Sequence, residues 1–513
     1  MNTETCFRYA KQSYQHGGSV ITKPEAWTED FKRKRTMPFA DFREWIEAMA
    51  RIDELKTFEN VDPDFEIGAL TEMSAEVKGP ALLFDKIKGY APGFRVASNL
   101  YRGHKRLLAT LEMPIDLTPN QALQRWRRVI SDFKPVLPVE VKSGPVLTHT
   151  MDGPEIDISI FPAPFWHELD GGRYIGTGDL VIVRDPDTGW INLGAYRIMN
   201  HDRSTGGIFI QSVRHGYQIA KKYWNKGQAC PVAVSLGQDP LILLAAGDTV
   251  ARTAEKICEY DFAGYIRGKP IEVVPGRLTG FPVPATAEVV LEGEIPSPEE
   301  ERRPEGPFGE YLGYYAHGTL PEPVLRVKSV SYRDNPILAG KPPLKPTFGG
   351  RIALPLGLGN LWNRLEQKEI TGIQDMRTIS GASCLVIAIH QEDESHVGRL
   401  IRALGEVKNI HRMTVIVDDD IDLADPRDVL WAIGTRAELK TGSHFFTGVC
   451  NDQLDPMMPD EVREKRGTFE FTRIVINACR PYRWITNFPP VVYSSEKWRG
   501  KIRERWGKNP FAK

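Results

Sequence analysis

Residues 180–199 read LVIVRDPDTGWINLGAYRIM, and this stretch predicts a β-hairpin. Two apolar segments, 180–183 and 190–199, flank the turn sequence DPDTG at 185–189. Pro, Asp and Gly favour turns, and short apolar runs on either side of such residues are typical of paired strands. Further strand patterns follow at 229–237, 285–295 and 324–333, with helical patterns at 215–224 and 251–259. We therefore expect a β-rich central domain with inserted helices.

The regions on both sides of this domain alternate helix and strand patterns, which is typical of α/β layers. Asp41 followed by Glu44 resembles a capping box that opens a helix over 41–56, and a second helical pattern covers 121–133. On the C-terminal side, strand patterns at 384–390 and 414–422 alternate with helical patterns at 396–404 and 426–435. The sequence thus predicts an α/β unit at each end of the chain.

The predicted fold class is a multidomain α+β protein. We divide it into an N-terminal α/β region (1–135), a central β domain (136–335), a C-terminal α/β domain (336–490) and a C-terminal helix or tail (491–513). In the tail, Trp498, Ile502 and Trp506 recur every four residues, and Gly507 follows. This aromatic stripe predicts a helix that docks on another domain or subunit.

Composition excludes several classes of partner. With 66 basic and 67 acidic residues the formal charge is -1, so no net field attracts nucleic acid or an anionic membrane. The six cysteines form no C-x-x-C pair, which argues against a disulfide framework or a structural zinc site. No signal peptide or membrane-spanning run is recognisable, so we expect a soluble cytoplasmic protein.

The segment Glu305-Gly-Pro-Phe-Gly-Glu310 carries the strongest chemical signal. Pro fixes φ and the glycines allow unusual conformations, so such a turn can aim both carboxylates at one point. Two carboxylates held together in a partly dry site cannot both ionise cheaply, and one of them becomes a proton donor near neutrality. The alternative interpretation is an acidic surface loop, because the preceding residues 298–305 are also rich in charge.

Arg197 lies in the apolar strand pattern 190–199, where a buried guanidinium needs a carboxylate partner. A fork of donors bridging Glu305 and Glu310 would satisfy it. The alternative is an edge-strand arginine that points into solvent.

Asn192, His215 and Glu259 offer an amide oxygen, an imidazole and a carboxylate, a mixture suited to magnesium or manganese. Each also has an ordinary explanation, such as a helix cap or a solvated helix residue. Asn192 and Arg197 are five residues apart, so an ideal strand sends them to opposite faces. A bulge at Gly194 could re-aim one side chain, or the two could serve opposite sides of one cofactor.

Other familiar site patterns are absent from the sequence, including G-x-G-x-x-G opening a βαβ unit, G-x-x-x-x-G-K-[ST] and G-x-S-x-G. Asp418, Asp419 and Asp420 lack the spacing of a calcium loop. We interpret them as a strand that ends in a solvated acidic turn.

In this order, several blocks resemble the UbiD family of decarboxylases. They are DPDTGWINLGAYRIMNHD, RHGYQIAKKYW, VPATAEVVLEGEI, EGPFGEYLGYY, VKSVSYRDNPIL and VDDDIDLADPRDVLWAIGTR. The similarity runs from about Lys78 to the C-terminal helix. It implies a central split β-barrel of flavin-reductase-like fold that holds prenylated flavin mononucleotide (prenylated FMN), followed by an α/β oligomerisation domain.

The resemblance also implies roles for individual residues. Arg197, Glu305 and Glu310 match the family's catalytic Glu-Arg-Glu set. The ligands of Mn2+ or Mg2+, which binds the cofactor phosphate, are matched by Asn192, His215 and Glu259. The resemblance also makes Asn192, Arg197 and His215 cofactor-binding residues. Arg436 resembles an arginine near a K+ site, and Lys408 a lysine that reaches the flavin phosphate.

The implied activity is reversible, non-oxidative decarboxylation of an aromatic or α,β-unsaturated acid, with Glu310 as proton donor. The DGGRYIGTG and NLGAYR segments look closer to bacterial aromatic-acid members than to fungal cinnamate-type enzymes, and residues 441–455, with His444, Phe445 and Phe446, are expected to form a substrate-facing loop. A phthaloyl-CoA-type decarboxylase is an alternative, as is a flavin-dependent oxidoreductase. The expected partners are a flavin prenyltransferase that supplies the cofactor and further copies in a homodimer or homohexamer.

Overall fold

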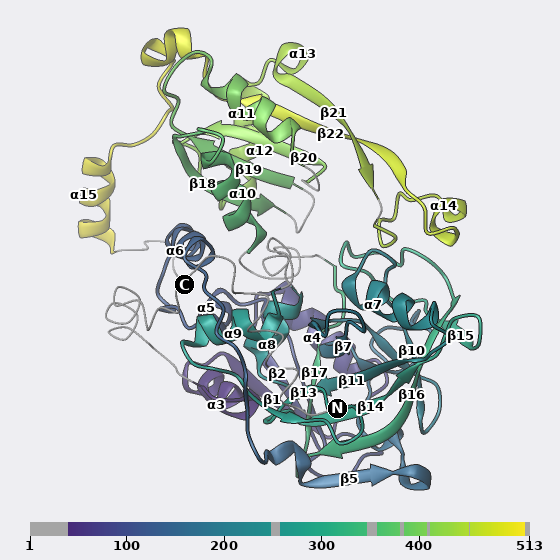
Figure 1. Ribbon diagram of the computed structural model, residues 1–513. Coiled ribbons are helices and arrows are strands. Elements are labelled where there is room, and N and C mark those ends of the chain that lie inside the picture. Colours follow the sequence, from purple (N-terminus) through teal and green to yellow (C-terminus); the bar gives the residue numbers. More distant parts are fainter. Residues whose placement is uncertain are drawn as a thin grey trace.

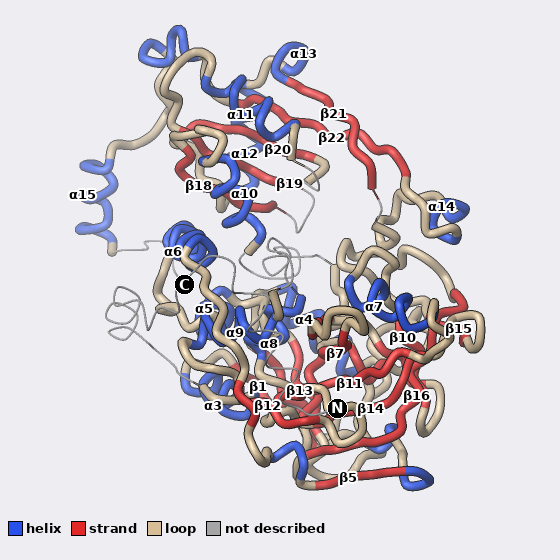
Figure 2. The backbone as a smooth tube through the Cα atoms, viewed as in Figure 1, coloured by secondary structure: helices blue, strands red, loops and turns tan. Residues whose placement is uncertain are grey.

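The computed structural model describes residues 39–247, 257–345, 356–379, 384–407, 411–450 and 452–507. These residues form three units, each built on a β-sheet (Figure 1). Figure 2 shows the strands of the C-terminal sheet grouped apart from those of the other two units, with helices around both groups. The predicted multidomain α+β class is therefore confirmed, with a curled antiparallel half-barrel at its centre.

The N-terminal unit contains a four-stranded sheet with helices packed against it. Its strand order is β1 (Leu55–Glu59), β2 (Ala81–Asp85), β3 (Arg95–Ser98) and β17 (Ile337–Gly340). Its helices are α3 (Phe42–Arg51), α4 (Glu66–Glu76), α5 (His104–Thr110) and α6 (Pro119–Ser131). Because β17 pairs with β3 in parallel, the chain returns to the first sheet after it has built the central unit.

Helix α3 forms where the capping pattern predicts it. The Asp41 side chain accepts from the Glu44 backbone N–H at 2.9 Å, and Phe42, Trp45 and Met49 are buried. The Glu44 carboxylate reaches back to the backbone N–H of Ala40, one residue before the predicted partner. The helix ends at Arg51, so the predicted extent to residue 56 is wrong. Asp53 has φ 58, a left-handed conformation that a right-handed helix cannot include, and β1 follows at once.

The central unit is a ten-stranded sheet in which neighbouring strands are antiparallel. The strand order is β6 (Tyr174–Gly176), β9 (Ile198–Asn200), β10 (Thr205–Ile208), β16 (Leu320–Tyr332), β14 (Val289–Ile295), β11 (Cys230–Leu236), β7 (Asp179–Arg184) and β8 (Ile191–Gly194). Strands β15 (Arg302–Glu305) and β5 (His149–Asp152) also pair with the long β16. A small sheet of β13 (Pro282–Pro284), β12 (Glu272–Pro275) and β4 (Val139–Glu140) lies beside it.

Strand β7 has both faces buried. Leu180 and Ile182 belong to one hydrophobic core, which extends into the N-terminal and C-terminal units, whereas Val181 and Val183 belong to the core of the half-barrel. Successive side chains of a strand point to opposite faces, so a continuous apolar run serves two cores at once. The predicted hairpin is confirmed, since β7 pairs with β8 in antiparallel register from Val181–Gly194 to Arg184–Ile191.

Three helices are inserted between the strands of the central unit: α7 (His215–Trp224), α8 (Pro240–Gly247) and α9 (Glu259–Arg267). The bounds of α7 match the predicted helical pattern. Of the predicted pattern at 251–259, residues 251–256 lie outside the described residues, and Glu259 begins a helix rather than ending one. Cys258 is extended and caps α9, so the described helix cannot extend backward through it.

The C-terminal unit contains a five-stranded mixed sheet. Its strand order is β18 (Ile373–Ile379), β19 (Cys384–Ile389), β20 (Met413–Asp418), β22 (Phe469–Ala478) and β21 (Ser443–Cys450). Its helices are α10 (Gly357–Glu366), α11 (His396–Gly405), α12 (Pro426–Arg436), α13 (Leu439–Gly442), α14 (Asp460–Glu464) and α15 (Glu496–Trp506).

Short 3-10 helices occur in the central unit at Pro145–Leu147, Gly153–Glu155 and Ile158–Ile160, and in the C-terminal unit at Tyr482–Asn487.

Strands β21 and β22 and the residues that connect them form an arm that extends from the C-terminal sheet toward α7 and β15 of the central unit (Figure 1). This corrects the expected loop at 441–455 in part, because residues 443–450 are a strand paired with β22, whereas Asp452 of the same range reaches Tyr311 in the central unit. Phe445 is largely exposed, and the ring of Phe446 lies against Gly405 of α11 rather than over the central unit.

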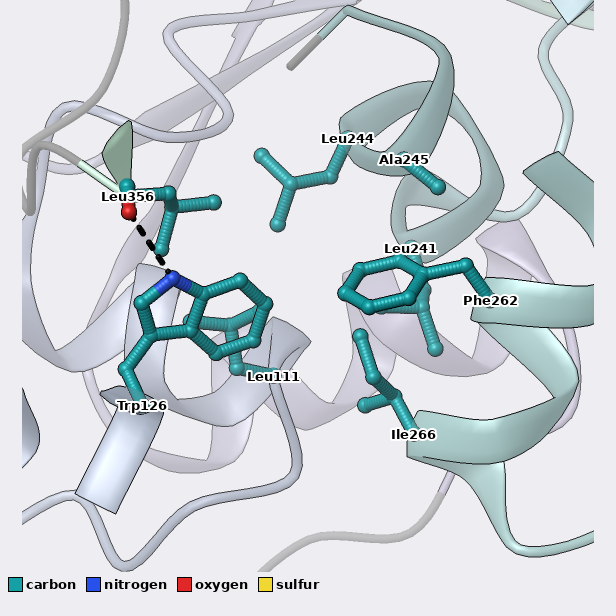
Figure 3. A pocket seen from close by; sticks show the side chains of 8 residues that line it. All are labelled: Leu111, Trp126, Leu241, Leu244, Ala245, Phe262, Ile266 and Leu356. Atoms are coloured by element: carbon teal, nitrogen blue, oxygen red, sulfur yellow. Dashed lines mark hydrogen bonds between the residues drawn. The ribbon is translucent and has the colours of Figure 1, made fainter. Parts of the chain in front are cut away.

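Residues of all three units line a small apolar pocket (Figure 3). Trp126 of α6 lies on one side of it, and Phe262 and Ile266 of α9 lie on the other. The Trp126 indole N–H donates to the backbone oxygen of Leu356 at 3.0 Å, just before α10 begins. This contact ties the start of the C-terminal unit to the N-terminal unit.

Helix α15 stands away from the rest of the chain (Figure 1). The predicted stripe of Trp498, Ile502 and Trp506 is exposed, at 59%, 46% and 61%. None of its side chains is buried against the described residues, so docking on another subunit stays a prediction. Across the residues that the structure describes, no helix combines the length and the apolar character that a transmembrane span requires.

Candidate active site

The position of Arg197 depends on a break between two strands. Strand β8 ends at Gly194, and β9 begins at Ile198 in a different part of the sheet. A side chain at Gly194 would meet the ring of Tyr196 at 2.4 Å, so glycine allows the tyrosine to fold back over the strand end. Asn192 lies in β8 and Arg197 in the connection after it. The alternation of side chains along a strand therefore does not relate Asn192 to Arg197, because no continuous strand contains both residues.

Arg197 bridges the two glutamates of the EGPFGE segment. Its Nε and Nη2 atoms donate to the two carboxylate oxygens of Glu305, each at 2.8 Å, and Nη1 donates to Glu310. The three side chains are no more than 8% exposed. The bidentate geometry toward Glu305 is the strongest form of arginine–carboxylate contact. The interpretations of an acidic surface loop and of a solvent-facing arginine are therefore wrong.

The backbone of the EGPFGE segment aims both carboxylates inward. Glu305 is the last residue of β15, Gly306 has φ 82, and the Gly306–Pro307 peptide bond is cis. A distant segment of the chain stabilises this turn, since the backbone N–H of Gly171 donates to the backbone oxygen of Pro307 at 2.7 Å. A side chain at Gly171 would lie 2.0 Å from the Gly306 oxygen, so that close approach requires glycine. After the turn, the Glu310 N–H donates to Tyr314.

Aromatic residues enclose the Glu-Arg-Glu group. The guanidinium carbon of Arg197 lies 4.2 Å from the centroid of Phe209 and 5.4 Å from that of Phe308. The Tyr174 hydroxyl donates to Glu305 at 3.0 Å. These rings exclude water from the charges, which strengthens every interaction among them.

Burial makes Glu310 an unusual acid. Burial raises the pKa of Glu310 to about 7, although the neighbouring Arg197 opposes the shift. The negative charges of Glu305 and Asp452 add to the rise. Burial alone would lower the pKa of Arg197, but Glu305 and Glu310 hold it above its usual value, so the arginine stays charged. The site thus combines a permanent cation with a carboxyl group that exchanges its proton near neutral pH.

His317 lies beside this group. Its Nε2 atom is 3.4 Å from Arg197 Nη2 and 3.8 Å from the Glu310 carboxylate. Its ring packs near Phe209, with 5.4 Å between centroids. Burial, followed by the charge of Arg197, lowers the pKa of His317.

The arm of the C-terminal unit reaches the same region. Asp452 accepts from the Tyr311 hydroxyl and from the Gln211 side chain, each at 2.7 Å. Arg466 pairs with Glu322 of β16 at 2.8 Å. The residue that follows Glu310 is therefore fixed to another structural unit.

The three candidate metal ligands lie around strand β8. The Glu259 carboxylate accepts from the backbone N–H of Leu193 at 2.8 Å, next to Asn192. The His215 ring lies edge-on to Trp190, with 5.2 Å between centroids, and Trp190 and Asn192 lie two residues apart, on one side of an extended chain. The structure thus places Glu259 beside Leu193 and His215 beside Trp190, and a common metal site with Asn192 stays a prediction.

These residues fit an oxygen-rich ligand group. The side-chain nitrogens of Trp190 and Asn192 are buried without a hydrogen-bond partner among the described residues. Buried polar groups are rarely left unpaired, and both atoms are N–H donors, so a phosphate oxygen is a suitable acceptor for them. Within the described residues, no three His, Cys, Asp or Glu side chains cluster as a metal site by themselves.

The last two predicted site residues are Lys408 and Arg436. Lys408 falls outside the described residues. Arg436 ends α12 in the C-terminal unit, where it donates to Asp418 at 3.2 Å and to Asp420 at 2.8 Å. Asp418 is buried, so the interpretation of a solvated acidic turn is wrong at that residue. The structure does not bring Arg436 to the Glu-Arg-Glu group through any contact in the described residues.

Sequence reasoning missed several residues of the site. Tyr174 belongs to the quoted DGGRYIGTG segment, and His317 follows the EGPFGEYLGYY block by two residues. Their position next to strong motifs was the available signal. Asp452 lies in the predicted substrate-facing range 441–455, but that prediction singled out His444, Phe445 and Phe446, and only the path of the arm brings Asp452 to Tyr311.

Comparison with known proteins decides the family. Family models of 3-octaprenyl-4-hydroxybenzoate carboxy-lyase match the chain in three parts: the N-terminal domain at 46–126, the Rift-related domain at 138–346 and the C-terminal domain at 359–478. A pyrrole-2-carboxylic acid decarboxylase from Pseudomonas aeruginosa is 30% identical over 92% of this chain and 98% of its own length. The chain belongs to the UbiD family of carboxy-lyases.

Other UbiD relatives agree with this placement. A phenolic acid decarboxylase from a Streptomyces species is 30% identical over 79% of this chain and 86% of its own length. The UbiD-class enzyme HmfF from Pelotomaculum thermopropionicum, solved with FMN, superposes with a TM-score of 0.77 at 27% identity, covering 90% of this chain and 99% of HmfF. An evolved dimeric form of HmfF, solved with prenylated FMN, has a TM-score of 0.74 at 27% identity and covers 90% and 98%. The family prediction is confirmed, and the chain is a UbiD-type decarboxylase.

Proposed function

We propose that this UbiD-type enzyme catalyses the reversible, non-oxidative decarboxylation of an aromatic acid, with prenylated FMN as cofactor and Glu310 as proton donor. The observation that carries the proposal is the buried contact between Arg197, Glu305 and Glu310, in which burial raises the pKa of Glu310 to about 7. An ordinary glutamic acid is protonated in only about one molecule in 500 at pH 7. Glu310 is protonated in about half.

Each member of the group has a distinct task in this proposal. When bound, the prenylated flavin supplies the electron sink that loss of CO2 requires. Glu310 then delivers a proton to the carbon that CO2 has left, and it recovers the proton from solvent. Arg197 holds the Glu310 carboxyl in place and keeps its pKa from rising beyond the working range, because its charge favours the ionised form. Glu305, with Tyr174, fixes the plane of the guanidinium.

Asn192, His215 and Glu259 would hold Mn2+ or Mg2+, which anchors the cofactor phosphate. The unpaired N–H donors of Trp190 and Asn192 support a phosphate group beside these residues, since both can donate to phosphate oxygens. Arg436 already neutralises Asp418 and Asp420, so we do not extend the proposal to a K+ site there.

The proposed substrates are benzoic or heteroaromatic acids. The relatives with named activities are a pyrrole-2-carboxylic acid decarboxylase and a phenolic acid decarboxylase, and these names support a planar ring with a carboxyl group. An aryl-CoA would need a cationic surface for its phosphates at the entrance, and no contact among the described residues favours that alternative. We propose that a flavin prenyltransferase supplies the cofactor and that the enzyme is a homo-oligomer, in line with the dimeric form of HmfF.

The decisive experiment expresses the protein with and without a flavin prenyltransferase. The absorption spectrum and the intact mass of the cofactor report loading. Release of CO2 and exchange of the ring proton for deuterium are then measured on pyrrole, furan and hydroxybenzoic acids. We expect activity only in the co-expressed protein and no bleaching by NAD(P)H, which would instead indicate a flavin oxidoreductase.

Two variants separate the role of Glu310 from general effects of charge. Glu310→Gln should retain the cofactor and lose about 10² to 10⁴ in turnover, the usual contribution of a positioned acid. Glu300→Gln removes an exposed carboxylate of the same region and should behave as wild type. Unchanged turnover in Glu310→Gln would contradict the proposed role.

A further inference from the structure

His317 has a defined hydrogen-bond state. Its Nδ1 atom lies 2.8 Å from the backbone oxygen of Gly318, and a carbonyl oxygen only accepts, so Nδ1 carries the hydrogen. In the neutral ring, Nε2 then has a free lone pair. That lone pair lies 3.4 Å from Nη2 of Arg197.

The Nη2 atom of Arg197 has one hydrogen left for this contact. Nε and one hydrogen of Nη2 face Glu305, and Nη1 faces Glu310. A guanidinium has five N–H groups in a rigid plane, so the second hydrogen of Nη2 is available to His317. A third carboxylate there would add a negative charge and raise the pKa of Glu310 further. A neutral imidazole accepts the hydrogen without changing the charge of the site.

Burial, followed by the charge of Arg197, keeps the His317 ring neutral. Arg197 faces its Nε2 edge, Arg463 of the arm acts in the same direction, and Glu305 and Glu310 oppose them. Burial and Arg197 outweigh the carboxylates, so the pKa of His317 stays below its ordinary value. At neutral pH, therefore, the ring acts as an acceptor toward Arg197.

We propose that His317 is a positioning residue for the proton donor, which accepts a hydrogen bond from Nη2 of Arg197 and thereby holds Nη1 against Glu310. This inference rests on the proposed role of Glu310. His317 does not take part in the chemistry itself in this arrangement. His317 orients Arg197, and Arg197 both positions the Glu310 carboxyl group and lowers its pKa.

The test compares two replacements of the ring. His317→Phe keeps an aromatic ring against Phe209 but cannot accept a hydrogen bond, whereas the side-chain oxygen of His317→Gln can reach the position of Nε2. Titration of Glu310 is followed by the infrared band of its protonated carboxyl group, which is assigned by its loss in Glu310→Gln. Turnover is measured on the cofactor-loaded enzyme at a series of pH values.

We expect His317→Phe to lower kcat about tenfold, the usual effect of losing a hydrogen bond to a charged group, with little change in KM. Because Arg197 lowers the pKa of Glu310, a less constrained arginine should move the infrared titration, and the alkaline limb of the rate profile, to higher pH. His317→Gln should stay close to wild type. His149→Leu, at an exposed histidine that pairs with Asp334, serves as the control.

The outcomes separate this inference from the proposed function. Wild-type titration and turnover in His317→Phe would overturn the role of His317. If His317→Phe does not fold, His317→Leu is measured in the same way and is judged by the same result. A shifted infrared titration together with an inactive wild type would support His317 as a positioning residue and overturn the proposed function instead.

Discussion

The hydroxyl of Tyr311 donates to the carboxylate of Asp452 at 2.7 Å, and this hydrogen bond joins the central unit to the arm of the C-terminal unit. Tyr311 follows Glu310 directly, so the backbone that carries the proposed proton donor is tied to a different sheet. Asp452 also adds to the rise in the pKa of Glu310. The position of the arm and the acidity of Glu310 are therefore coupled.

Removing this hydrogen bond should uncouple the arm from the site. We expect Tyr311→Phe to retain the cofactor but to lose several-fold in turnover, because the bond contributes about 1.5 to 3 kcal/mol when the acceptor is charged. Limited proteolysis near residue 452 should become faster in the variant. Tyr482→Phe, which removes a hydroxyl hydrogen bond on the surface of the C-terminal unit, is the matched control. Equal turnover and equal proteolysis in the two variants would argue against coupling.

The rate should depend on the protonation of Glu310. Because burial raises the pKa of this carboxyl group to about 7, the protonated form dominates below that pH and is lost above it. Turnover should thus fall as pH rises through about 7, once protonation of the donor limits the rate. The pH dependence of kcat measures this limb. A flat profile between pH 6 and pH 9 in wild-type enzyme would contradict it.

Arg197 should not tolerate lysine. Lysine keeps the charge but cannot donate in the planar fork that holds Glu305 and Glu310 together. We expect Arg197→Lys to lose at least about 100-fold in turnover, because the donor is no longer positioned. Thermal unfolding should show a clear loss of stability, since the buried carboxylates are left partly unpaired. Arg203→Lys, at an exposed arginine that pairs with Asp157, should leave both quantities unchanged.

The proposed metal site depends on the amide of Asn192. Asn192→Leu has the same branched shape and number of heavy atoms but offers no oxygen ligand, so we expect bound manganese and the occupancy of the flavin to fall together. Metal analysis and the absorption spectrum measure the two quantities. Asn225→Leu at the exposed end of α7 is the control. Full metal content in Asn192→Leu would remove Asn192 from the ligand set.

Sequence patterns located most of the secondary structure because local rules govern it. The hairpin of β7 and β8, helix α7 from His215 and the cap at Asp41 all follow from turn chemistry and periodicity. Sequence patterns placed the end of helix α3 too late, because Asp53 has a left-handed backbone conformation. They also predicted a loop at residues 443–450, where a strand extends beyond its sheet.

The site itself was only partly accessible from sequence. Glu305 and Glu310 lie close in the chain, so their spacing was informative. Their contact with Arg197 spans more than 100 residues, and family resemblance rather than periodicity indicated it. Asp452 fell inside the predicted range 441–455 but was not singled out, because its approach to Tyr311 depends on the tertiary path of the arm.

The two-stranded arm has a mechanical consequence. Strand β20 pairs with β22 only at residues 474–478, so residues 469–473 extend beyond the body of the sheet over about 17 Å. A rotation of the sheet therefore produces its largest displacement at the far end of the arm. A tilt of the sheet by about 10° would carry the tip through about 3 Å, given the strand rise of about 3.3 Å per residue. That displacement is enough to break the contact with Tyr311 while the internal packing of both units stays intact.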